Sequence, residues 1–488
     1  MNDKIKKLKH FIIKHDELFF IILFLVMILG YGLNVKTISG DEVWNFMNSF
    51  KIYNGYKIYV DANIITTPMF FVIAVIIFKI FGCNFFVFRI YNVITCLCIF
   101  LMGYKILKKL DLRKRNAFFI MIIIFFFERS IIYNMANYNT LALLFCLIGF
   151  YIILIKQNLK KYWLIESIFI GLIFLTKQNI GIFYLCGYIL YSLINKEKFT
   201  DFIKIITNFL FIVALFLFIL VKLNCFYGFI DYCILGLKDF SAMNKYFDVK
   251  YTLILICVVF FNISFIIYSI FVYNIKQVKE NKNLHIIIPF SFTLLLISYP
   301  ILNESHIITS LFLQLIIFWY FINVFFIKKH IYNDFLKYIS IVLIIFLASS
   351  SLKHTYDYFK IIINDNNSYK DIYFGTIISE DLNEKINKVD DFILNSNKNV
   401  ILISIDAGII NMPLNISNGC FDLPLLGNLG KGGENKLINE IINMNDVYIL
   451  INEKKGSLQE SDRIRNYIIN NLKFVGNIDD ILIYEKIK

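Results

Sequence analysis

Long apolar runs alternate with short basic loops over the first 352 residues, and this alternation constrains the fold more than any other feature. The first run, Leu18 to Val35, is long enough to cross the hydrocarbon core of a bilayer. Five Lys and two His lie just before it, in residues 2–15, and basic residues beside a span mark its cytoplasmic side. We therefore expect a cytoplasmic N-terminus, with Ser39-Gly40-Asp41-Glu42 on the far face of the membrane.

The composition agrees with a polytopic membrane protein. Of the 488 residues, 58% are hydrophobic, and the mean hydropathy is +0.66. A soluble domain of this length cannot bury so much apolar surface. The net charge of +13 comes from Lys and Arg that cluster between apolar runs, so membrane topology explains it and we expect no nucleic-acid partner. Richness in Ile, Asn and Lys is typical of an AT-rich bacterial genome, which places the expected membrane in a bacterial cell.

The Lys and Arg of the loops predict the topology. The most basic loop, 105–115, is expected in the cytoplasm, and the other loops then alternate consistently. The apolar segment Thr67 to Gly82 breaks this alternation if it spans, so we expect it to lie in the outer interface or to re-enter the membrane. The pattern predicts a polytopic α-helical protein of about 11–13 transmembrane helices, with full spans at 18–35, 85–107, 117–133, 138–155, 163–176, 179–194, 205–221, 251–273, 285–299, 307–327 and 335–352.

The composition changes from Lys353 onward, where Asp, Glu and Asn become frequent. Short apolar runs at 399–405 and 446–451 are typical of buried strands, and 434–444 and 460–472 have helical periodicity. We expect two domains: a membrane module, 1–352, with a first outer loop at 36–84, and an extracytoplasmic α/β domain, 353–488. The glycine-rich stretch 427–433 is interpreted as a turn because it lacks the Lys-Ser/Thr ending of a phosphate loop.

Two adjacent carboxylates, Asp41 and Glu42, follow the first span. On a helix they would point about 100° apart and so play different parts. Asp41 has two interpretations, which are compatible: it caps a helix that continues through Trp44 and Met47, or it acts as a base towards a substrate at the membrane face. The same loop carries Tyr53, Tyr56, Tyr59 and Asp61, which indicate either an aromatic belt at the interface or a substrate-binding loop.

The order of these features resembles the GT-C glycosyltransferases, especially those of the bacterial protein O-mannosyltransferase and aminoarabinose-transferase type, glycosyltransferase family 39. The features are Asp-Glu after the first span, an aromatic segment, Asn-Gly-Tyr, an Asp, a Pro-initiated apolar helix ending in Phe81-Gly82, and Arg89 in the next span. The likeness covers roughly residues 15–350. It implies a GT-C fold, juxtamembrane helices in the first loop, and Asp41 as the general base that deprotonates an acceptor.

The resemblance also implies a polyprenyl-phosphate sugar as donor and an extracytoplasmic glycan, lipid or protein as acceptor. Cations would stabilise the leaving phosphate. Many members have Lys-Pro-Pro where this chain has Thr66-Thr67-Pro68, so that cation is missing. The expected donor-phosphate contacts are Arg89, Arg129, Lys177 and His306, with Glu304 towards the acceptor. Structural alternatives remain open: Lys177 as a snorkelling side chain, Glu128-Arg129 as a local ion pair, and His306 as a packing residue.

We expect no cofactor, although Asp41, Glu42 and Asp61 would supply carboxylates for a divalent cation if one were used. Two other classes compete with the transferase. A lipid-linked glycan flippase would place ionisable residues deep in its spans, where this chain has few. A surface-polysaccharide polymerase or ligase would have a long outer loop rich in Arg, whereas 223–250 has none. The sequence therefore favours a multi-pass enzyme of the bacterial cytoplasmic membrane.

Overall fold

The computed structural model describes residues 16–33, 40–128, 137–156, 159, 161–196, 198–237, 249–268, 282–298, 304–326, 330–364, 371–376, 379–404, 407–416, 418–419, 421, 425–455 and 460–486. Their chain forms two compact units. The helical unit comprises Met1–Val35, Arg89–Ile212 and Tyr246–Asp365. The mixed unit comprises Lys36–Phe88, Val213–Lys245 and Asn366–Lys488.

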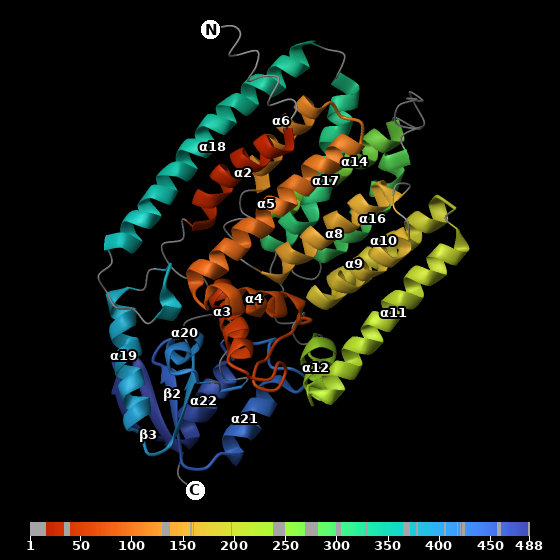
Figure 1. The fold of residues 1–488 in the computed structure, drawn as a ribbon. Helices are drawn as coiled ribbons and strands as arrows, with labels where there is room; N and C mark the ends of the chain where they lie inside the picture. Colours follow the sequence, from red (N-terminus) through yellow and green to blue (C-terminus); the bar gives the residue numbers. More distant parts are fainter. Residues whose placement is uncertain are drawn as a thin grey trace. The chain divides into compact units, whose positions relative to one another are not determined.

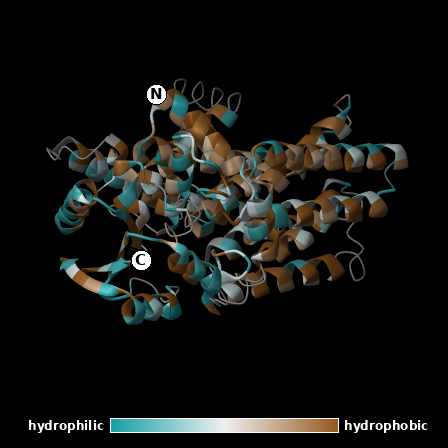
Figure 2. Ribbon diagram, turned by 90° about the horizontal axis from the view of Figure 1, so that it is seen from below, coloured by the Kyte–Doolittle hydropathy of each residue, from teal (hydrophilic) through white to brown (hydrophobic). Residues whose placement is uncertain are grey.

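Apolar helices make up the helical unit (Figure 1), and each predicted span overlaps one of them in its described residues. Five helices in the described part of the chain are long and apolar enough to cross a membrane by length and composition. Long hydrophobic stretches along the helices are visible in Figure 2. The predicted fold class, a polytopic α-helical membrane protein with a small C-terminal sheet domain, is confirmed. The helices are α2 (Asp16–Leu33), α5 (Phe85–Lys109), α6 (Lys114–Glu128), α8 (Tyr138–Leu154), α9 (Tyr162–Thr176), α10 (Gln178–Ile194), α11 (Phe199–Lys222), α14 (Val249–Ile267), α16 (Lys282–Leu294), α17 (Glu304–Phe326) and α18 (His330–Asn364).

A glycine contact joins α2 to α18. The Gly30 amide donates to Ser351 Oγ at 2.9 Å, and this hydroxyl donates to the Val26 carbonyl at 2.6 Å. A Cβ on Gly30 would lie 1.9 Å from the Ser351 carbonyl oxygen, so the two backbones approach closely only because this residue has no side chain. Small residues at helix contacts are how membrane helices gain dispersion energy where the hydrophobic effect is weak.

The C-terminal part of the mixed unit contains a four-stranded sheet in the order β1-β2-β4-β3. β1 (Asn399–Ile403) and β2 (Val447–Asn452) are parallel, whereas β4 (Ile481–Lys486) pairs antiparallel with both β2 and β3 (Lys473–Ile478). Apolar faces of α21 (Gly433–Asn443) and α22 (Asp462–Asn471) complete its core. The predicted strands and helices are confirmed here, while α19 (Glu380–Asn395), α20 (Ala407–Asn411) and the β3–β4 hairpin were not predicted.

The first outer loop folds as part of the mixed unit. It contains α3 (Gly40–Tyr53) and α4 (Met69–Phe81), which pack through Trp44 on Phe71 and Phe46 on Phe78, with ring centroids 6.0 and 5.4 Å apart. The opposite side of α4 exposes Ile76. Thirteen residues extend about 20 Å, less than the roughly 30 Å of a bilayer core. The location of 67–82 relative to the membrane stays a prediction, because α16, which lies in a predicted span, is also thirteen residues long.

Hydrogen bonds tie this loop to the C-terminal residues. Tyr56 Oη donates to the Asn415 carbonyl at 2.6 Å, and the Phe86 amide donates to the Phe374 carbonyl at 2.9 Å. The domain boundary at residues 352 and 353 stays a prediction; in the structure α18 continues through that point as one helix.

Replacing Gly30 by Leu should destabilise the protein by about 1–3 kcal/mol, because the new side chain must displace the Ser351 backbone. Thermal unfolding in detergent measures the change. Ile22→Leu, on an exposed position of the same helix, is the control and should unfold like wild type. An unchanged unfolding temperature for the Gly30 variant would contradict the close contact.

Candidate functional site

Asp41 and Glu42 lie in the first turn of α3, where the helix dipole favours negative charge. Being neighbours on a helix, they face different surroundings: Asp41 is exposed and Glu42 is fully buried. Although solvent reaches Asp41, protein surrounds it closely enough that desolvation raises the pKa of its carboxyl group above the usual value. A carboxylate that is accessible yet has a raised pKa is suited to accept a proton from a bound hydroxyl or amine.

A polar stripe along α3 was missed by the sequence interpretation. Asn45 Nδ2 donates to the Asp41 carbonyl at 2.9 Å, and Ser49 Oγ donates to the Asn45 carbonyl at 2.8 Å. Asn48 donates in the same way to the Trp44 carbonyl at 2.9 Å. These polar side chains are all buried, which is uncommon unless they have a binding or structural role. Asn45 and Ser49 follow Asp41 at intervals of four residues, and this spacing could have predicted that they share one face of the helix with Asp41.

The C-terminal domain supports α3 from another side. Figure 1 shows α20 beside α3, and the two helices are in contact. A Cβ on Gly408 of α20 would lie 2.6 Å from Met47 Sδ, so the glycine lets the helices approach. The helix that carries Asp41 is thus packed between α4 and α20.

The predicted substrate-loop residues mainly hold the loop together. Tyr59 is buried and donates from Oη to the Thr66 carbonyl at 2.8 Å, and Asp61 Oδ2 accepts from the Lys57 amide at 2.7 Å. Tyr56 binds the Asn415 carbonyl, and the Tyr53 ring packs 6.3 Å from that of Phe78. Their direct role towards a substrate stays a prediction.

Lys177 lies at a junction of helix ends in the helical unit. It is the extended residue between α9 and α10, and its Nζ donates to Asn139 Oδ1 at 2.7 Å. The same Nζ lies 3.3 Å from His306 Nε2 and 5.1 Å from the Tyr138 ring centroid. Lys177 and His306, both predicted as phosphate contacts, are therefore brought together, while Tyr138 and Asn139 were not predicted.

The partners of the Lys177 ammonium are neutral. Lys177 is buried, and none of the ion pairs found among the described residues involves it. A buried ammonium surrounded by an amide, an imidazole and an aromatic ring favours an anion as its counter-charge.

The other predicted residues have separate positions. Arg89 is buried in the first turns of α5. Arg129 lies outside the described residues. Glu304 is the first residue of α17, two positions before His306, and its side chain is not described. Glu128 ends α6 with both carboxylate oxygens buried and without a hydrogen-bond partner among the described residues.

No three His, Cys, Asp or Glu side chains within the described ranges come close enough together to hold a metal ion. Metal-independent chemistry stays a prediction.

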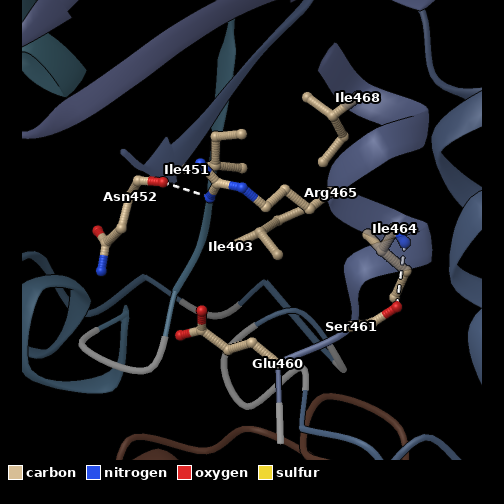
Figure 3. Close-up of a pocket in the computed structure, with 8 residues that line it drawn as sticks. All are labelled: Ile403, Ile451, Asn452, Glu460, Ser461, Ile464, Arg465 and Ile468. Atoms are coloured by element: carbon tan, nitrogen blue, oxygen red, sulfur yellow. Dashed lines mark hydrogen bonds between the residues drawn. The ribbon is translucent and has the colours of Figure 1, made fainter. Parts of the chain in front are cut away.

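Figure 3 shows a small pocket beside β1, β2 and α22, lined largely by isoleucines. Its polar groups bind the protein itself: the Arg465 guanidinium donates to the Asn452 carbonyl, and Ser461 Oγ caps α22 by accepting from the Ile464 amide at 3.0 Å. We assign this pocket no catalytic part.

Comparison with known proteins identifies one family by sequence. Residues 66–221 match the family described as dolichyl-phosphate-mannose-protein mannosyltransferase. No curated protein matches this sequence.

Solved structures share the fold. ArnT from Cupriavidus metallidurans in the apo state has a TM-score of 0.57 at 12% identity, covering 96% of this chain and 97% of ArnT. ArnT bound to undecaprenyl phosphate has a TM-score of 0.55 at 11% identity, with the same coverage. AglB, the oligosaccharyltransferase of Archaeoglobus fulgidus in complex with an inhibitory peptide and a dolichol-phosphate, has a TM-score of 0.53 at 12% identity, covering 97% of this chain and 74% of AglB. Residues 66–221 therefore resemble the mannosyltransferase family, and the chain has the fold of ArnT and AglB, as the predicted resemblance to the GT-C glycosyltransferases implied.

Proposed function

We propose that the protein is an integral-membrane glycosyltransferase that moves a sugar from a polyprenyl-phosphate donor to an acceptor outside the cytoplasm. The acceptor nucleophile attacks the anomeric carbon and loses its proton to Asp41. The bond between that carbon and the phosphate oxygen breaks, and the polyprenyl phosphate leaves with the electron pair. The observation that carries the proposal is the environment of Asp41, an accessible carboxylate with a raised pKa on a firmly packed helix.

The donor half of the proposal rests on Lys177. Its buried ammonium, held by Asn139 beside His306, supplies positive charge where a phosphate would gain negative charge in the transition state. Arg89 is proposed as a second cation for the same phosphate. The lipid carriers bound in ArnT and AglB, undecaprenyl phosphate and dolichol-phosphate, support a polyprenyl phosphate as the leaving group.

The location follows from the charge pattern of the loops. We place the protein in a bacterial cytoplasmic membrane, with the N-terminus in the cytoplasm and both α3 and the C-terminal domain on the outer side. The packing of α3 against α20 supports a common side for these two parts.

Asp41→Asn should lower the transfer rate by about 10²–10⁴-fold, because the amide keeps the shape of the side chain but cannot accept the proton. The measurement uses purified protein in lipid and a panel of radiolabelled polyprenyl-phosphate sugars, and follows label released to water or to a cell-envelope extract. Asp381→Asn, an exposed carboxylate in the first turn of α19, is the matched control and should keep full activity. An active Asp41→Asn protein would remove the central assignment.

The pH profile of kcat/KM should have an acidic limb above the usual Asp pKa of 3.8. The base must be ionised to accept a proton, and desolvation disfavours the ionised form, so activity rises as pH rises through the raised pKa. An acidic limb at or below 3.8 would show that the titrating group is not this carboxyl.

Lys177→Met should raise the KM for the donor about tenfold or more, because it removes a charge-assisted contact to phosphate. Lys177→Arg should recover part of the loss. Lys156→Met is the matched control: this lysine also lies at a helix end, over the ring of Tyr191, and is predicted on the cytoplasmic side. Equal donor KM values for wild type and Lys177→Met would refute the assignment of the phosphate site.

A further inference from the structure

A cavity of about 370 Å³ lies in the mixed unit, and Asp41 is not among its lining residues. This volume falls within the range of about 300–1,000 Å³ that is usual for small-molecule sites. Three segments far apart in the sequence form it: the first outer loop, the helix pair α12 (Phe226–Ile230) and η2 (Asp231–Leu235), and the C-terminal domain. We call it the tyrosine pocket, after the residues used below: Tyr59, Tyr227, Asp231, Tyr232, Lys436 and Glu440.

Close backbone contacts hold the walls of the tyrosine pocket together. A Cβ on Gly228 would lie 2.0 Å from the Tyr59 carbonyl oxygen, so the outer loop rests directly on α12. Gly430, with a φ of +73°, would place a Cβ 2.5 Å from the Asp231 carboxylate. That carboxylate accepts from the Lys431 amide at 2.8 Å, which joins the glycine-rich turn to η2. These backbone contacts therefore fix the walls of the pocket relative to one another.

The charges of the tyrosine pocket exclude an anionic ligand. Its cation, Lys436, binds Asp231 Oδ2 at 2.7 Å and Tyr232 Oη at 3.2 Å, so its charge is already balanced. Glu440 adds a second carboxylate to the lining. The lining as described therefore offers a phosphate or a nucleic acid no cation that is not already bound to a carboxylate.

The remaining groups suit a neutral molecule with many hydroxyl groups. Tyr227 is 86% exposed and offers an aromatic face to the pocket region, while Val60 is the one aliphatic side chain of the lining as described. Aromatic faces bind apolar C–H surfaces, and carboxylates and phenol groups exchange hydrogen bonds with hydroxyls. A sugar ring has both kinds of surface.

We propose that the tyrosine pocket binds a saccharide, the glycan part of the acceptor, with Tyr227 packing on a sugar face and Glu440 accepting from its hydroxyls. The inference that a saccharide binds here depends only on the residues of the pocket. The inference that this saccharide is the acceptor rests on the proposed function. The pocket and α3 belong to the same compact unit, so a glycan held there is carried by the unit that also carries Asp41.

Saturation-transfer NMR on the full-length protein in nanodiscs tests the proposal. The probes are mono- to trisaccharides of glucose, mannose, galactose, rhamnose and N-acetylglucosamine. Tyr227→Ala should weaken binding about tenfold, because it removes the stacking face, whereas Tyr227→Phe should retain most of it. The high exposure of Tyr227 makes its replacement harmless to folding, and Tyr356→Ala, at a tyrosine that is 67% exposed on α18, is the matched control.

Binding by wild type and the control, with loss in Tyr227→Ala, supports the proposal. Absence of saccharide binding by wild type, or equal binding by Tyr227→Ala, overturns it. Asp41→Asn separates this result from the proposed function: it should bind saccharide like wild type while transferring no sugar. If wild type binds saccharide at Tyr227 and transfers no label from any donor, the proposed function fails and the saccharide site stands.

Discussion

The packing of α3 against α4 on one side and α20 on the other is the interaction on which the proposed chemistry depends. Fourteen residues with several buried polar side chains would make a marginal helix alone. Aromatic contacts from Trp44 and Phe46, and the glycine contact at Gly408, stabilise it in the folded protein. A carboxylate on such a support keeps its position and its raised pKa, as a general base requires.

The same packing gives the C-terminal domain a part that its sequence does not reveal. The domain has a mixed sheet with helices, and the described pocket beside β1 and β2 is lined by isoleucines and by Arg465, which binds the protein's own Asn452 carbonyl. Its loops contact the first outer loop, and Lys436 of α21 binds Asp231 of the helix pair α12–η2. We therefore regard this domain as a support for α3 and as one wall of the tyrosine pocket, not as a separate catalytic domain.

Asp41, the proposed base, and Lys177, the proposed phosphate contact, have side chains of opposite charge. Asp41 is an accessible carboxylate whose ionised form is disfavoured by desolvation, which makes it a better proton acceptor once ionised. Lys177 is a buried amine with neutral described partners, and burial lowers its pKa to about 7, so an anion beside Nζ would stabilise the charged form. A transfer reaction needs both characters, because one group removes a proton while the other stabilises a departing phosphate.

Hydrophobic periodicity and loop charge determined much of this protein from the sequence. The apolar helices and the two buried strands at 399 and 447 follow from local patterns, because burial in lipid or in a core selects residues one by one along the chain. That the two strands are parallel was not predicted. Asp41 was identified as a candidate from its position after the first span, and Lys177 and His306 from the resemblance to the GT-C glycosyltransferases. Only the tertiary structure decided that Asn139 binds Lys177, that α20 supports α3, and that Tyr59, Tyr227 and Lys436 line one cavity. These contacts join residues far apart in the chain, and their energies depend on close approach at glycines such as Gly228 and Gly408, which no local pattern records.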